Sequence, residues 1–114
     1  MSAPTDLVER QCKPCEGGVP PLEPAAAEEL LAALHENWSI SDDGKWIRRE
    51  FNFTGFNKTM GFVNAVAWIA NTEGHHPDME VHYSKCVVNY TTHAVDGLTE
   101  NDFICAAKID RLLV

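Results

Sequence analysis

The strongest constraint on the fold is a long helical apolar stripe that lies between two β-hairpin patterns. In "TGFNKTMGFVNAVAWIANTEG" the apolar residues recur with the period of a helix, and Gly74 provides a C-terminal stop. The residues of the stripe are Phe56, Met60, Val63, Val66, Ala67, Ile69 and Ala70. This pattern predicts a largely buried helix over residues 57–72.

The flanking stretches have the alternation that is typical of strands. In "WSISDDGKWIRREFNF" two short extended segments surround the turn "SDDG", and apolar residues alternate with polar ones in the second segment. In "MEVHYSKCVVNYTTH" a short alternating segment is followed by a turn at Ser84 and Lys85 and by a β-branched and aromatic run. Each stretch predicts one hairpin.

Two more helices complete the order of elements. One starts at Pro24, carries a leucine-rich face and ends near Asn37. The other opens with Thr99 and Asp102 at the spacing of a capping box. The order α-β-β-α-β-β-α predicts an α+β fold, with a four-stranded antiparallel sheet and three helices packed on one face.

Length and charge limit the possible functions. The 114 residues suit a single domain, which we place at residues 24–114, after a proline-rich, flexible N-terminal arm over residues 1–23. A formal charge of -8 disfavours direct binding of nucleic acid or anionic lipid. Neither a long apolar run nor a secretory signal pattern is present, so we expect a cytoplasmic protein with no membrane partner.

The four cysteines do not form a recognisable metal motif. Cys12 and Cys15 form one CxxC in the arm, without the second CxxC that a zinc site needs. Cys86 and Cys105 lie in apolar patterns that are typical of core positions. We expect four reduced thiols and no bound metal.

Four histidines are candidates for a functional site. His75 and His76 are adjacent and precede Pro77, which favours an extended backbone. Because successive side chains of an extended segment point apart, the two imidazoles cannot easily bind the same metal ion. His82 points outward from its strand, as a solvated or partner-facing residue does. His93 ends a strand and begins a loop.

Two interpretations of these histidines stay open from the residues alone. Two imidazoles that titrate near neutral pH can act as an acid and a base without a metal. Alternatively, His75 only caps the end of the long helix, and His93 only satisfies loop backbone groups.

The segment "EGHHPDMEVHYSKCVVNYTTHAVDGLTENDF" resembles the signature of the pterin-4a-carbinolamine dehydratase family. The shared elements are His-His-Pro, an aromatic residue in the next strand, a later histidine, and a Gly-Leu-Thr-x-x-Asp helix start. The resemblance covers residues 24–113. It implies the same α+β fold and a homodimer or homotetramer without a cofactor. The implied reaction is dehydration of a 4a-hydroxytetrahydropterin to a quinonoid dihydropterin, a step of tetrahydropterin recycling after aromatic amino-acid hydroxylation.

The resemblance also implies roles for individual residues. His75 and His93 correspond to the acid/base pair. The residues that correspond to the pterin-binding wall or to a carboxylate beside a catalytic imidazole are His76, Thr91, Thr92 and Asp102. A carboxylate in that place holds the tautomer of an imidazole and raises its pKa.

One position departs from the family pattern. Asn71 stands where many members have a glutamate, and the nearest carboxylate is that of Glu73. Either residue is therefore a candidate for the role of that glutamate. The departure keeps one alternative open, a pterin-binding protein in molybdopterin metabolism. The resemblance itself implies a second alternative, a non-catalytic dimerisation cofactor, because animal members of the family also act as cofactors of a transcription factor.

Overall fold

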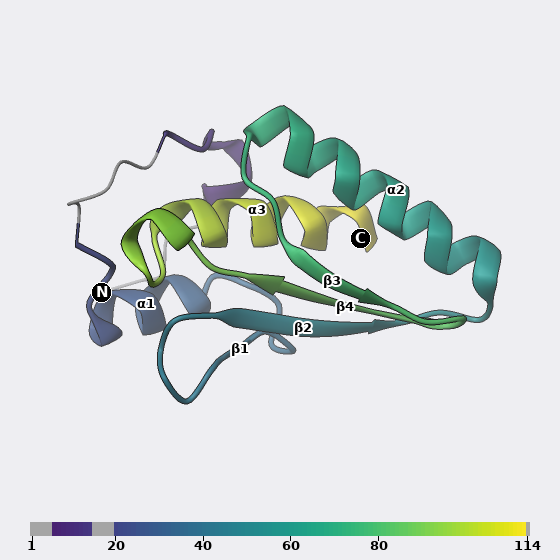
Figure 1. Cartoon of the computed structure of the whole chain (residues 1–114), viewed down its shortest axis with the longest axis horizontal. Helices are drawn as coiled ribbons and strands as arrows, with labels where there is room; N and C mark the ends of the chain where they lie inside the picture. The colour runs from purple at the N-terminus through teal and green to yellow at the C-terminus, as the bar shows by residue number, and fades with distance from the viewer. Residues whose placement is uncertain (1–5, 15–19, 114) are drawn as a thin grey trace.

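The computed structural model describes residues 6–14 and 20–113 and has the predicted α+β architecture (Figure 1). The helices are α1 (Pro24–Leu31), α2 (Phe56–Glu73) and α3 (Glu100–Asp110), with 3-10 turns η1 (Leu7–Glu9), η2 (His93–Val95) and η3 (Arg111–Leu113). The strands are β1 (Ser39–Ile40), β2 (Ile47–Asn52), β3 (Asp78–Val81) and β4 (Lys85–Tyr90). All strand pairs are antiparallel, in the order β1-β2-β4-β3, and the helices cover one face of the sheet.

The two central strands confirm the predicted alternation. In the register of β2 and β4, Ile47 pairs with Tyr90 and Phe51 pairs with Cys86. These four side chains are buried beneath the helices. Arg48 and Glu50, which alternate with them on β2, point to the other face and are exposed.

Helix α2 spans the predicted residues, but its buried face is rotated from the predicted stripe. Phe62 and Val66 lie at the centre of the buried face, and the ring of Phe62 lies 4.5 Å from that of Phe51. Phe56 is 51% exposed, and Ala67 is exposed as well. The apolar stripe is broad, so more than one rotation of α2 about its axis would bury apolar side chains. Packing against the sheet determines which of these side chains face the core. No helix within residues 6–14 and 20–113 is long and apolar enough to cross a membrane.

Helix α1 ends at Leu31 rather than near Asn37. The chain turns early because Trp38 enters the core, where it is 3% exposed. The indole Nε1 of Trp38 donates to Oδ1 of Asp110 at 2.8 Å, and the backbone N–H of His35 donates to Oδ2 at 3.0 Å. A carboxylate at the end of α3 therefore fixes the connection that follows α1.

Residues 6–14 of the predicted N-terminal arm pack against the rest of the domain. Leu7 is 2% exposed and belongs to the core, and Nζ of Lys108 on α3 donates to the carbonyl of Val8 at 2.8 Å. One apolar residue in a proline-rich stretch creates no repeating pattern, so the packing of Leu7 in the core could not be predicted from the sequence. Cys15 lies outside the described residues.

Gly97 provides a test of the packing between the chain before α1 and the loop before α3. A Cβ atom at Gly97 would lie 2.7 Å from Cβ of Pro21. We expect Gly97→Ala to lower the free energy of unfolding by about 1–3 kcal/mol, measured by urea denaturation, because the proline ring must shift.

Gly61 is the matched control, since it lies inside α2 and a Cβ there meets no atom within 4 Å. We expect Gly61→Ala to raise stability by about 0.5–1 kcal/mol. Equal effects of the two substitutions would contradict the packing described here.

Candidate active site

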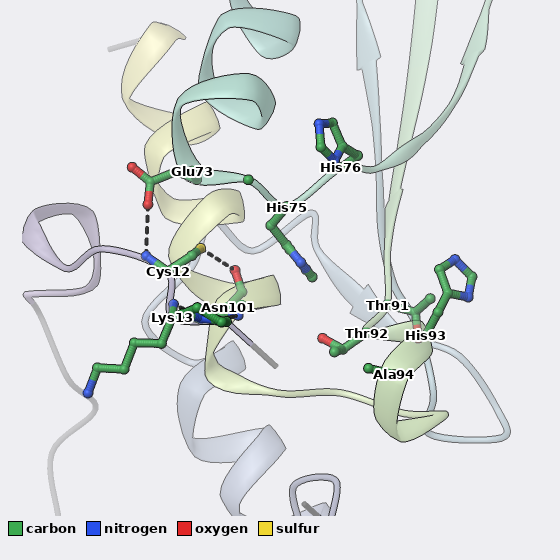
Figure 2. A pocket seen from close by; sticks show the side chains of 12 residues that line it. Cys12, Lys13, Glu73, His75, His76, Thr91, Thr92, His93, Ala94 and Asn101 are labelled. Carbon is green, nitrogen blue, oxygen red and sulfur yellow. Dashed lines mark hydrogen bonds between the residues drawn. The ribbon is translucent and has the colours of Figure 1, made fainter. Parts of the chain in front are cut away.

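A cavity of about 500 Å³ lies where the end of α2, the end of β4, η2 and the N-terminal segment meet (Figure 2). Six residues proposed from the sequence line it: Glu73, His75, His76, Thr91, Thr92 and His93. The fold therefore brings together residues that lie up to twenty positions apart.

The end of α2 separates the two adjacent histidines. Gly74 adopts the left-handed conformation, with φ 67°, and ends the helix. The chain then runs extended towards β3, so that His75 is partly buried and His76 is exposed on the cavity wall. Their side chains diverge, as predicted. Among residues 6–14 and 20–113, no three His, Cys, Asp or Glu side chains are grouped to hold a metal ion.

His75 makes a close ion pair with a fully buried carboxylate. Its Nε2 lies 2.6 Å from Oδ1 of Asp102, whose side chain is 0% exposed. The other carboxylate oxygen, Oδ2, accepts from the Thr92 hydroxyl at 2.9 Å and from the Thr99 backbone N–H at 3.0 Å. Because an ionised carboxylate only accepts hydrogen bonds, Nε2 of His75 carries a proton, and Nδ1 is left to exchange one with a ligand.

Asp102 changes the acidity of His75. Burial lowers the pKa of the imidazole, but the hydrogen bond and the negative charge of Asp102 together outweigh it, so the pKa of His75 lies above its ordinary value. The ring of His75 also stacks on Tyr90, with centroids 5.4 Å apart and an interplanar angle of 7°. The imidazole is therefore fixed in position and biased towards its protonated form.

His93 lies across the cavity from His75 and is held more loosely (Figure 2). It is the first residue of η2, its side chain is exposed, and its ring lies in a T-shaped arrangement with Trp46, with centroids 5.8 Å apart. The two candidate acid/base residues thus line one cavity but differ in burial.

The two threonines line the cavity with their hydroxyl groups already engaged. Thr91 donates to the carbonyl of Lys45, and Thr92 donates to Asp102. Asp102 itself lies behind His75 and does not line the cavity. These three residues shape and support the site, and their polar atoms do not point freely into it.

The structure separates the two candidates for the missing glutamate. Asn71 is exposed on α2 and is not part of the cavity wall. Glu73 lines the cavity, and its Oε1 accepts from the backbone N–H of Cys12 at 2.8 Å. His82 lies in the turn between β3 and β4, outside the cavity.

Sequence reasoning missed the contribution of the N-terminal segment. Cys12, Lys13 and Pro14 line the cavity, as does Asn101 at the start of α3. The CxxC motif was the sequence feature that stood out in this segment, and it suggested metal binding or redox chemistry rather than a place in the lining of a cavity. Asn101 carried no signal, because one polar residue in the first turn of a helix is unremarkable.

Comparisons of this sequence with known proteins find one family. The family model described as pterin 4 alpha carbinolamine dehydratase matches residues 20–112. A relative from Nitrosomonas eutropha is 58% identical over 96% of this chain and 95% of its own length. A relative from Legionella pneumophila (strain Paris) is 52% identical over 96% of this chain and 97% of its own length. Both carry the provisional name pterin-4-alpha-carbinolamine dehydratase.

Two solved structures share the fold. A protein from Brucella melitensis, titled transcriptional coactivator/pterin dehydratase, matches with a TM-score of 0.76 and 32% identity, over 81% of this chain and 97% of its own. A pterin dehydratase-like protein, titled a RuBisCO assembly factor in the alpha-carboxysome, matches with a TM-score of 0.60 over 68% of this chain and 90% of its own. At 20% identity the second match bears on the fold alone.

The ion pair between His75 and Asp102 predicts a specific pH dependence. A raised histidine pKa means that the pair stabilises the fold fully below pH of about 6.5 and that this stabilisation is lost as the pH rises through the folded pKa. In Asp102→Asn we expect the pKa of His75, followed by NMR, to fall, because burial then becomes the dominant influence and only the weaker interaction with Cys105 opposes it. The stability difference between wild type and variant should shrink as the pH rises. An unchanged histidine pKa would disprove the coupling.

Proposed function

Because the chain belongs to the pterin 4 alpha carbinolamine dehydratase family, we propose that it is a hydro-lyase that converts a 4a-hydroxytetrahydropterin to a quinonoid dihydropterin and water. The observation that carries this proposal is the buried pair of His75 and Asp102 at a cavity that also holds His93. A cavity of about 500 Å³ is of a size that suits a two-ring ligand.

The reaction requires two proton transfers and no change of oxidation state. The bond between C4a and the hydroxyl oxygen breaks, and the oxygen takes up a proton and leaves as water. N5 gives up its proton, and the electron pair that is released forms the double bond between C4a and N5. One acid and one base near neutral pH are therefore sufficient.

The two imidazoles differ in a way that suits these two roles. His75 is biased towards its protonated form by Asp102, so Nδ1 of the protonated ring is suited to deliver a proton to the leaving hydroxyl. His93, on the opposite wall, then accepts the proton from N5. His76 orients the pterin from the exposed side, and Thr91 and Thr92 shape the wall beneath it.

The biological setting that we propose is tetrahydropterin recycling after aromatic amino-acid hydroxylation. Asn71 favours one alternative, a pterin-binding protein without turnover, as in molybdopterin metabolism. This residue offers no carboxylate at a position where many members of the family have a glutamate. A non-catalytic dimerisation cofactor is the other alternative, since the Brucella melitensis protein is titled a transcriptional coactivator as well as a dehydratase.

We propose that the chain is a homodimer or homotetramer. Several apolar side chains on the outer face of α2 and at the β3–β4 hairpin are exposed: Phe56 at 51%, Trp68 at 73%, Val81 at 44% and Tyr83 at 72%. Strand β3 is also an edge of the sheet. Exposed apolar groups beside an open edge are typical of surfaces that pair with another subunit.

The acid/base roles are tested by a stopped-flow assay of 4a-hydroxytetrahydropterin dehydration. We expect His75→Ala and His93→Ala each to lower kcat by about 10²–10⁴, the usual contribution of a positioned acid or base. His82→Ala is the matched control, since His82 lies outside the cavity, and it should retain wild-type kcat. Full activity of His75→Ala would refute the assignment.

Substitution of Asn71 tests whether the protein is an enzyme or a pterin-binding protein without turnover. Because Asn71 is exposed and outside the cavity wall, we expect Asn71→Glu to change kcat/KM by less than about threefold. Equilibrium binding of 7,8-dihydrobiopterin to each protein provides the control for ligand affinity. A wild type that binds this pterin without turnover, and gains turnover in Asn71→Glu, would instead support the pterin-binding alternative.

A further inference from the structure

We propose that Cys12, Lys13 and Pro14 form a pterin-contacting wall of the site, and that Asn101 is the residue that positions this wall. The proposal rests on the proposed pterin chemistry and adds a substrate-binding element to it. All four residues line the same cavity as His75.

Asn101 holds the wall by a two-point amide contact. Its Oδ1 accepts from the backbone N–H of Lys13 at 3.0 Å, and its Nδ2 donates to the backbone carbonyl of Lys13 at 2.6 Å. A side-chain amide that pairs with both groups of one residue imitates a neighbouring strand and fixes that residue in position and orientation. Asn101 is only 7% exposed, so this contact is shielded from water.

Cys12 anchors the wall to both helices of the site. Its backbone N–H donates to Glu73 at the end of α2, and its Sγ lies 3.5 Å from Sγ of Cys105 on α3. Figure 2 shows this segment beside the end of α2 and the start of α3. Glu73 lies two residues before His75, and Asn101 directly precedes Asp102. The wall is therefore fixed to the same helix ends that hold the ion pair of the site.

This arrangement predicts an effect on binding rather than on proton transfer. Without the amide of Asn101, the wall shifts, but the contact between His75 and Asp102 does not involve Asn101 and is retained. A substituted protein should therefore bind the pterin more weakly and still convert it once it is bound. A purely structural role for Asn101 would instead lower stability and leave KM unchanged.

The first test compares steady-state dehydration by three variants. We expect Asn101→Ala to raise KM by about tenfold, the effect of losing one net hydrogen-bond contribution, with kcat within about threefold of wild type. Asn101→Gln, which retains the amide, should recover part of the loss. Glu100→Gln is the matched control: it removes the ion pair between Glu100 and Arg10, which holds the same segment outside the cavity, and should leave KM unchanged.

The second test follows the wall directly, through alkylation of Cys12 by iodoacetamide. The hydrogen bond with Cys105 raises the pKa of Cys12, so its reactive thiolate is scarce while the segment is in place. We expect Asn101→Ala to accelerate labelling of Cys12 by about tenfold or more, and 7,8-dihydrobiopterin to slow labelling of the wild type. Fragment-ion mass spectrometry assigns the label to Cys12 rather than to Cys15.

The outcomes separate this proposal from the proposed function. Unchanged KM and unchanged Cys12 labelling in Asn101→Ala, with an active wild type, would overturn the positioning role and leave the dehydratase assignment intact. Labelling of wild-type Cys12 that 7,8-dihydrobiopterin does not slow would overturn the contact between wall and pterin. An inactive wild type would refute the proposed function, and the labelling rates without ligand would still decide whether Asn101 holds the wall.

Discussion

The carboxylate of Asp102 has no access to solvent, and its burial constrains the elements around it. A buried charge is tolerated only when hydrogen bonds and an opposite charge replace the water that it has lost. Its partners come from three places: His75 after α2, Thr92 at the end of β4 and Thr99 at the start of α3. Satisfying one carboxylate therefore brings together three of the chain segments that form the cavity, and it also favours the protonated form of the imidazole.

A second carboxylate performs a related structural task at the other end of α3. Asp110 accepts from the Trp38 indole and from the guanidinium of Arg49, which lies 2.7 Å away. The two acidic residues thus tie α3 to the loop after α1, to the sheet and to the end of α2. With α3 held at both ends, Asn101 in its first turn is a firm support for the N-terminal segment. The amide of Asn101 attaches the wall to α3, and Glu73 attaches it to the end of α2.

Several features of the fold and the site could be predicted because they depend on local sequence. The order of elements follows from changes of apolar period, and the divergence of His75 and His76 follows from the extended backbone before Pro77. The capping box of Thr99 and Asp102 is also a local pattern, and the structure contains it. Other features depend on contacts between distant segments, such as the packing of Leu7 in the core and the rotation of α2. No local period records such contacts.

The sequence by itself determined the α+β fold, the family and the histidines that are candidates for catalysis, because period, turn chemistry and a spaced motif are all written along the chain. Only the tertiary structure decided which groups lie together. In the folded protein Oδ2 of Asp102 accepts a hydrogen bond from Thr92. Glu73 rather than Asn71 lines the cavity, and residues 12–14 form part of the cavity wall. These outcomes depend on the packing of chain segments that are up to about ninety residues apart, as are Lys13 and Asn101.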